Sequence, residues 1–137
     1  RELFDEVITI EKDFSRVRLF VDNLIKYDEN YNLNNSRFVH GYSYEPSTIH
    51  KVEQILGDNL LDMLFIDGNH SYQDILTDYL IYKNFLKPGG YLVVHDYMWP
   101  FNDYEIKRFI DSLKGKYDIH KIIHSKEQGI VVLRRKK

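Results

Sequence analysis

Two short polar segments of this sequence carry side chains that can move a proton or hold a metal ion. The first segment is Asp67-Gly68-Asn69-His70, and the second is His95-Asp96. Imidazole and carboxylate groups act as general acids and bases, and both are common ligands for divalent cations. Two carboxylates held close together repel each other unless a cation, an imidazolium or a shared proton compensates their charge. Brought together, these residues would therefore form either a metal site or a proton relay.

The residues between the two segments predict the elements that position them. The apolar run Leu61–Ile66 is typical of a strand buried on both faces, and Tyr91–Val94 predicts a second strand. Ser71 followed by Asp74 matches a capping box at the start of a helix, which Pro88-Gly89-Gly90 would end. The apolar positions at helical spacing are Tyr72, Ile75, Leu76, Tyr79, Leu80 and Leu86.

Strand, helix and strand in this order form a βαβ unit, whose two strands are parallel and whose crossover is right-handed. Both polar segments then leave the sheet at the same edge, where open α/β sheets bind ligands. Neighbouring strands lie about 4.8 Å apart. We therefore expect Asp67, His70, His95 and Asp96 to converge on one point.

The rest of the chain continues the alternation of strands and helices. Helices are expected after Asp13 or Ser15, from Pro46 to Gly57, and from Tyr104 to Leu113. The last two strands are separated by a short loop and should form an antiparallel hairpin. The expected strands are Val7–Ile10, Phe38–Gly41, Leu61–Ile66, Tyr91–Val94, Ile119–His124 and Ile130–Leu133.

Composition sets the outer limits of the fold and its partners. The 137 residues fit one domain, 43% of them are hydrophobic, and the formal net charge is −2. Acidic and basic residues are mixed along the chain, so we expect neither a nucleic-acid nor a membrane partner. The basic end Arg134–Lys137 is expected to be a solvated terminus. No cysteine, signal peptide or membrane span is present, and we expect a cytoplasmic protein; a homo-oligomer is compatible with the sequence.

The order of elements and the central motifs together resemble one known family. IDGNHSY, then Asp78, then LKPGGYLVVHDY resemble class I S-adenosylmethionine-dependent methyltransferases, in the small-molecule group that includes macrocin-type and cephalosporin-biosynthesis enzymes. The resemblance runs from Phe4 to Leu133. It implies an α/β, Rossmann-like fold with a mostly parallel sheet, S-adenosylmethionine as cofactor, and methylation of a hydroxyl on a small acceptor such as a sugar or phenol.

The sequence departs from this family at the start of the fold. Members begin with a strand and a glycine-rich turn that cradles the methionine part of the cofactor, and neither is found before Val7. A sheet without its central strand leaves unpaired backbone groups, which are costly when buried. We therefore expect residues 1–137 to be a single but incomplete domain that binds the cofactor weakly, unless the flanking strands have closed up.

The resemblance also implies roles for individual residues. Glu11, which follows the first strand, would accept the ribose hydroxyls of the cofactor, and its alternative is an ordinary exposed acid. Tyr42 and Ser43 stand where the family contacts adenine, and Asp67 would also contact the cofactor. Tyr97, Trp99 and Phe101 would serve the acceptor site or the core. Each role rests on the position of the residue in the family pattern.

In metal-dependent members of this family, an acid after one strand and two polar residues after the next bind a divalent cation. The resemblance places Asp67, His95 and Asp96 in these positions. The expected cation is Mg²⁺ or Mn²⁺, of which the imidazole suits Mn²⁺ better. His70 or His95 would be the catalytic base; capping of loops and of the helix start is the alternative for these residues.

Two other functional classes need comparison with the enzyme. Without the glycine-rich turn, the chain could be a non-catalytic Rossmann-like module that acts in assembly or regulation. A phosphoacceptor receiver domain would need an acidic pair after its first strand and a lysine after the fifth, and His95-Asp96 occupies that last place. The sequence therefore favours a methyltransferase, with the non-catalytic module as the alternative.

Overall fold

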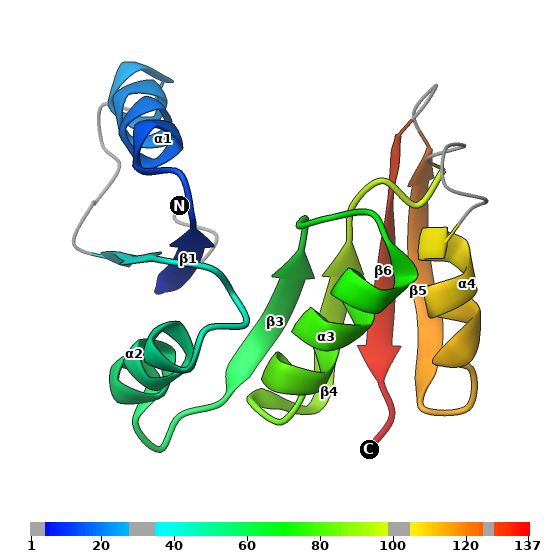
Figure 1. Cartoon of the computed structure of the whole chain (residues 1–137). Helices are drawn as coiled ribbons and strands as arrows, with labels where there is room; N and C mark the ends of the chain where they lie inside the picture. The colour runs from blue at the N-terminus through cyan, green and yellow to red at the C-terminus, as the bar shows by residue number, and fades with distance from the viewer. Residues whose placement is uncertain (1–4, 28–34, 99–104, 125–127) are drawn as a thin grey trace. The chain divides into compact units, whose positions relative to one another are not determined.

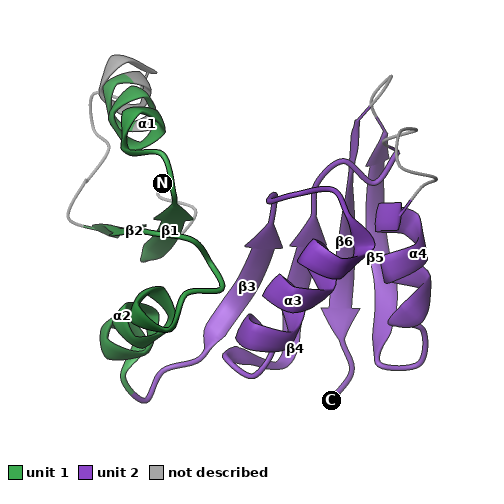
Figure 2. Ribbon diagram, viewed as in Figure 1, with its two compact units in different colours: residues 1–57 green, residues 58–137 purple. Residues whose placement is uncertain are grey.

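The computed structural model describes residues 5–27, 35–98, 105–124 and 128–137. Strands and helices alternate in the predicted order, with two strands at the end. The chain divides into two compact units, residues 1–57 and residues 58–137 (Figure 2). The expectation that residues 1–137 form a single domain stays a prediction. None of the described helices is both long and apolar enough to cross a lipid bilayer.

The first unit contains two parallel strands and two helices. Its elements are β1 (Val7–Glu11), α1 (Phe14–Tyr27), β2 (Ser36–His40) and α2 (Pro46–Leu56). Asp13 Oδ1 accepts the amide of Ser15 at 2.9 Å, so Asp13, and not Ser15, caps α1. Pro46 begins α2, where a residue without an N–H group breaks no helical hydrogen bond.

Gly41 lets α2 approach the end of β2. Its φ angle is +148°, which side chains rarely adopt, and a Cβ atom there would lie 2.2 Å from Thr48 Oγ1. Thr48, in the first turn of α2, is 1% exposed. The turn after β2 therefore requires glycine for two reasons, its backbone conformation and the lack of space.

The second unit is a four-stranded sheet with two helices. Its elements are β3 (Leu61–Ile66), α3 (Tyr72–Tyr82), β4 (Leu86–Val94), α4 (Glu105–Ser112), β5 (Tyr117–His124) and β6 (Gly129–Arg135). The strand order is β3-β4-β6-β5 (Figure 1). β3 and β4 are parallel neighbours and β5 and β6 are antiparallel, which confirms both predicted pairings. β1 and β2 form a separate two-stranded sheet in the first unit.

The turn between α3 and β4 differs from the prediction. The helix ends at Tyr82, and Leu86, predicted to be helical, instead begins β4 by pairing with Leu61. Pro88-Gly89-Gly90, predicted as the helix stop, lies within an irregular part of β4, and regular pairing resumes at Tyr91. Burial explains the difference, because pairing with β3 places the Leu86 side chain in the core at 1% exposure.

The basic C-terminal residues hold this turn. Arg135 donates from Nη1 to the carbonyl oxygens of Lys83 and Leu86, and Arg134 Nε donates to the Gly89 carbonyl at 3.4 Å. The prediction of a solvated terminus is therefore wrong for Arg135, which is partly buried, whereas Arg134 is exposed as expected. The carbonyls at the end of a helix have no helical partners, and a guanidinium satisfies them well.

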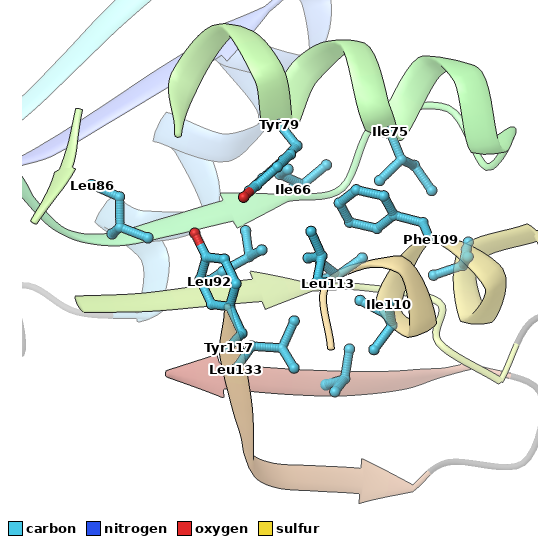
Figure 3. Packing of buried hydrophobic residues seen from close by; sticks show 13 residues of the cluster. Ile66, Ile75, Tyr79, Leu86, Leu92, Phe109, Ile110, Leu113, Tyr117 and Leu133 are labelled. Carbon is cyan, nitrogen blue, oxygen red and sulfur yellow. The ribbon is translucent and has the colours of Figure 1, made fainter. Parts of the chain in front are cut away.

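The core of the second unit lies between the sheet and its helices, which cover the same face of the sheet (Figure 1). Phe109 of α4 is fully buried and contacts Tyr72 and Tyr79 of α3 edge to face, with ring centroids 6.4 Å and 5.6 Å away. Figure 3 shows Phe109 and Tyr79 within the buried cluster. The buried cluster consists of Ile66, Ile75, Tyr79, Leu86, Leu92, Val94, Ile106, Phe109, Ile110, Leu113, Tyr117, Val131 and Leu133.

Two expectations about burial are wrong. Phe65 of β3 is 49% exposed, so this strand is not buried on both faces. Leu80, assigned to the apolar face of α3, is also exposed. Phe65 is exposed because α3 and α4 both lie on one face of the sheet and leave the other face of β3 uncovered. An apolar run predicts a strand, but it does not say which of its faces a helix will cover.

Removal of the Phe109 ring should destabilise the second unit. We expect Phe109→Ala to lower the free energy of unfolding by about 3–5 kcal/mol, because it leaves a cavity among fully buried side chains. Urea denaturation followed by tyrosine fluorescence measures the change. Ile119→Ala is the control, since Ile119 is 53% exposed and should change the stability by about 0.5 kcal/mol or less. Equal losses in the two variants would contradict this view of the core.

Replacement of Gly41 should loosen the first unit. Gly41→Ala must strain the backbone and displace Thr48, and we expect a loss of about 1–3 kcal/mol. Hydrogen exchange of the α2 amides reports the local stability. Gly57→Ala is the matched control, because Gly57 has a φ of +55° but no atom within 4 Å of an added Cβ. Equal hydrogen-exchange rates of the α2 amides in the two variants would show that the close approach to Thr48 does not contribute to stability.

Candidate functional site

The two polar segments lie at one edge of the second unit's sheet. Ile66 ends β3 and pairs with Val94, which ends β4. The amide of His95 donates to the Ile66 carbonyl at 3.1 Å, so the pairing extends one residue past the end of β4. The residues that follow both strands are therefore held side by side, as the parallel pairing predicts.

Asp96 is at the centre of the resulting cluster. Its Oδ2 lies 2.8 Å from His70 Nε2 and 3.1 Å from His95 Nδ1. His95 Nδ1 also lies 3.2 Å from Asp67 Oδ1. The structure thus brings together all four residues that the sequence predicts for this cleft: Asp67, His70, His95 and Asp96.

Two buried polar atoms of the cluster lack a hydrogen bond among the described residues. They are His95 Nδ1, which is close to two carboxylates but makes no well-aligned bond, and Asp96 Oδ1. Buried polar atoms usually have a partner, because desolvation without one is costly. Atoms of Asp67, His95 and Asp96 that can ligate a metal all lie within 4.8 Å of one another. These three residues fit a divalent cation, which would satisfy both atoms.

The backbone of Asp96 is in an unusual conformation. Its φ is +54°, and among the described residues it is the only one other than glycine with a positive φ. Aspartate tolerates this left-handed region better than most residues, although the conformation still costs energy. Asp96 is also 5% exposed, so a strained backbone holds a carboxylate away from solvent. Such strain is frequent at functional sites, where it fixes the direction of a side chain.

The surroundings of Asp67 in the cleft shift the pKa of its carboxyl group. Burial is the largest cause and raises the pKa of the Asp67 carboxyl above its usual value. The neighbouring Asp96 also raises this pKa, while His95 and His70 lower it. The side chain remains 48% exposed, so Asp67 lies at the open rim of the cluster and Asp96 lies at its base.

The start of α3 positions His70. Ser71 is the N-cap, and its hydroxyl accepts the amide of Asp74 at 3.1 Å. The Asp74 carboxylate accepts hydrogen bonds from the Ser71 hydroxyl at 2.5 Å and from Asn69 Nδ2 at 2.6 Å. Asn69 Oδ1 in turn accepts the His70 amide at 2.9 Å. Asn69 was not predicted as a site residue from the sequence, although it stands between the candidate residues Asp67 and His70.

The predicted cofactor residues of the first unit also share one edge. Glu11 ends β1, and its carbonyl accepts the amide of Gly41 at 3.2 Å, next to Tyr42 and Ser43. Glu11 Oε1 accepts the Asp13 amide at 2.9 Å, which holds the carboxylate in place. The carboxyl ends of parallel strands thus bring Glu11 near the predicted adenine loop.

An exposed aromatic surface adjoins Glu11. The rings of Tyr42 and Tyr44 lie 5.3 Å apart at 30°, and both are exposed. Lys12 Nζ lies 5.6 Å from the centre of the Tyr42 ring. The sequence had no signal for Lys12, since an isolated lysine is usually solvated. Ser43 belongs to the same turn.

The residues after β4 are described only in part. Tyr97 packs against the core of the second unit. Trp99 and Phe101, predicted to serve the acceptor site or the core, lie outside the described residues.

Comparisons with known proteins show the family of this chain. A family model described as a methyltransferase domain matches residues 2–97. The Uncharacterized protein R132 of Acanthamoeba polyphaga mimivirus is 35% identical over 78 residues, which cover 56% of this chain and 34% of that protein. This chain therefore matches about a third of the length of the viral relative.

Solved structures of methyltransferases have the same fold. The O-methyltransferase from Bacillus cereus, in complex with SAH, has a TM-score of 0.70 at 16% identity, over 96% of this chain and 63% of that one. The O-methyltransferase TomG from Streptomyces achromogenes, in complex with SAM, has a TM-score of 0.68 at 18% identity, over 96% and 62%. These likenesses confirm the predicted fold class, an α/β, Rossmann-like methyltransferase fold. The match to the family model over residues 2–97 shows that this chain belongs to the methyltransferase-domain family.

Proposed function

We propose that this chain carries the site of an S-adenosylmethionine-dependent methyltransferase. Its acceptor is a hydroxyl on a small molecule such as a sugar or phenol, and a divalent cation, Mg²⁺ or Mn²⁺, assists it. The observation that carries the proposal is the convergence of Asp67, His70 and His95 on the buried carboxylate of Asp96. Solved O-methyltransferases with this fold, in complex with SAH and SAM, support the choice of cofactor and reaction.

In the first unit, the cofactor-binding residues are Glu11, Tyr42 and Ser43. A carboxylate can accept both hydroxyls of a ribose, and Glu11 is held in place for this by the Asp13 amide. The exposed ring of Tyr42 offers a flat surface for adenine, beside the hydroxyl of Ser43. Asp67 is proposed as a further cofactor contact.

In the second unit, the cleft residues handle the proton of the acceptor. Methyl transfer needs an acceptor oxygen aligned with the methyl carbon and freed of its proton. His70 takes this proton, and Asp96, at 2.8 Å from Nε2, orients its ring. His95 is the second candidate base. Asp67, His95 and Asp96 would hold a cation, which when bound lowers the pKa of a nearby hydroxyl and orients it.

A test of the cofactor role uses Glu11→Ala. Loss of hydrogen bonds to a charged group should weaken binding of S-adenosylhomocysteine by about 1.5–3 kcal/mol, or roughly 10- to 100-fold. Ligand-detected NMR measures the affinity, since it also reports weak binding. Glu53→Ala is the matched control, because it removes an exposed acid from α2 of the same unit.

The same titration separates the two functional classes. Unchanged affinity in a folded Glu11→Ala variant would remove Glu11 from the site. Weak binding is expected of these residues alone, so the non-catalytic module would be favoured only if a form of the protein extended at the N-terminus also failed to bind S-adenosylhomocysteine.

A second test concerns the cation. We expect Mn²⁺ to bind with about one ion per chain, and Asp96→Asn to abolish that binding, because it removes the carboxylate charge at the centre of the cluster. Calorimetry measures binding, and methyl transfer should stop in chelator and return with Mg²⁺ or Mn²⁺. Asp62→Asn, an exposed acid of β3, is the control.

Other outcomes of this test point to different chemistry. Full turnover in chelator would leave a proton relay, and His70→Ala or His95→Ala would then be the damaging change. Turnover that survives substitution of all four cleft residues would show that this cleft is not the active site.

A further inference from the structure

A second concave site lies at the other end of the sheet from the cleft. The cleft follows the carboxyl ends of β3 and β4, whereas this pocket lies where β4 and β5 begin and β6 ends. It has a volume of about 350 Å³, within the range of sites for small molecules. Tyr79 of α3 contributes to its wall, together with Lys83, Asn84, Lys116, Tyr117, Arg135 and Lys136.

The lining of this pocket is strongly cationic. Four of its side chains carry a positive charge and none carries a negative one, although the whole chain has a net charge of −2. Lys136 Nζ pairs with Asp118 at 3.3 Å. Among the described residues, no carboxylate lies within 4.0 Å of the charged groups of Lys83, Lys116 or Arg135. Like charges gathered without compensation raise the local concentration of anions.

Two of the cationic groups are held in place. Arg135 donates from Nη1 to the carbonyls of Lys83 and Leu86, which fixes the plane of its guanidinium beside the pocket. Lys83 Nζ lies 5.8 Å from the centre of the Tyr79 ring. A guanidinium has five N–H donors, so the two carbonyls leave others for a ligand. The site is therefore partly organised before any ligand binds.

Two tyrosines place their hydroxyl groups beside these charges. Tyr79 and Tyr117 are buried, their rings lie 6.1 Å apart, and their hydroxyls point toward each other (Figure 3). Burial, with the hydrogen bond to Tyr79, raises the pKa of the Tyr117 hydroxyl. The Tyr117 hydroxyl therefore keeps its proton at neutral pH.

We propose that this pocket binds a small molecule that carries a phosphate group. Lysine ammonium groups, an arginine fork and hydroxyl donors are the groups that recognise phosphate oxygens. The volume of about 350 Å³ and the aromatic wall favour a small phosphorylated compound over an extended polyanion. The site is separate from the residues proposed for methyl transfer and does not depend on them.

The test uses pyrophosphate and inorganic phosphate as probes of the folded chain. We expect saturable binding of pyrophosphate by calorimetry, with shifts of the backbone amides of Lys116 and Tyr117 in NMR spectra. The double variant Lys83→Gln with Lys116→Gln should weaken this binding about 10-fold or more. Neither side chain is buried, so the variant should fold.

The matched control is Lys107→Gln with Lys121→Gln, which removes two charges from exposed positions of the same unit and should leave the affinity unchanged. Equal weakening in both double variants would show only a general charge effect and overturn the proposal. Absence of saturable binding at millimolar pyrophosphate would also overturn it. Binding of an oligonucleotide through Lys83 and Lys116, without binding of pyrophosphate, would overturn the proposal as well. The ligand would then be an extended polyanion.

Discussion

The parallel pairing of β3 with β4 is the interaction on which the candidate active site depends. Both strands end at the same level, with Ile66 opposite Val94, and the His95 amide continues the pairing to the Ile66 carbonyl. A parallel pair sends both following segments to one edge of the sheet. If the strands were antiparallel, the segments that begin at Asp67 and His95 would lie at opposite ends. The chemistry of the cleft is thus a consequence of strand direction.

One residue of the cleft, Asp96, combines several energetically unfavourable features. Asp96 has a buried carboxylate, a left-handed backbone and an oxygen without a hydrogen bond among the described residues. Each feature costs energy, and they persist only where the surrounding structure stabilises them. Here the support comes from the buried cluster around Phe109, which fixes both helices against the sheet. A well-packed core next to a strained polar group is the arrangement expected of a functional site.

The two ends of the second unit's sheet differ in charge. Carboxylates follow the carboxyl ends of β3 and β4, and cationic side chains gather where β6 ends. The basic C-terminal residues have two roles in this arrangement. Arg135 donates to the carbonyls of Lys83, at the end of α3, and of Leu86, at the start of β4, and it also lines the cationic pocket. Because the length of the sheet separates the two sites, an anion at one end would be only weakly repelled by the carboxylates at the other.

The sequence by itself determined the order of elements, the βαβ unit and the convergence of Asp67, His70, His95 and Asp96. These features follow from local signals, namely apolar runs, a helix cap and polar residues at strand ends, combined with the rule for parallel crossovers. The roles of Glu11, Tyr42 and Ser43 stay predictions; the structure shows only that their segments meet at one edge.

Only the tertiary structure decided where β4 begins, which face of β3 is covered and how the cleft residues pair. Leu86 belongs to the strand and not to the helix because pairing with Leu61 buries its side chain. Phe65 is exposed because both helices of its unit lie on the other face. The left-handed backbone of Asp96, which places its carboxylate against both histidines, had no signal in the sequence. Burial and pairing depend on neighbours that are distant in the chain, and local periodicity carries no information about them.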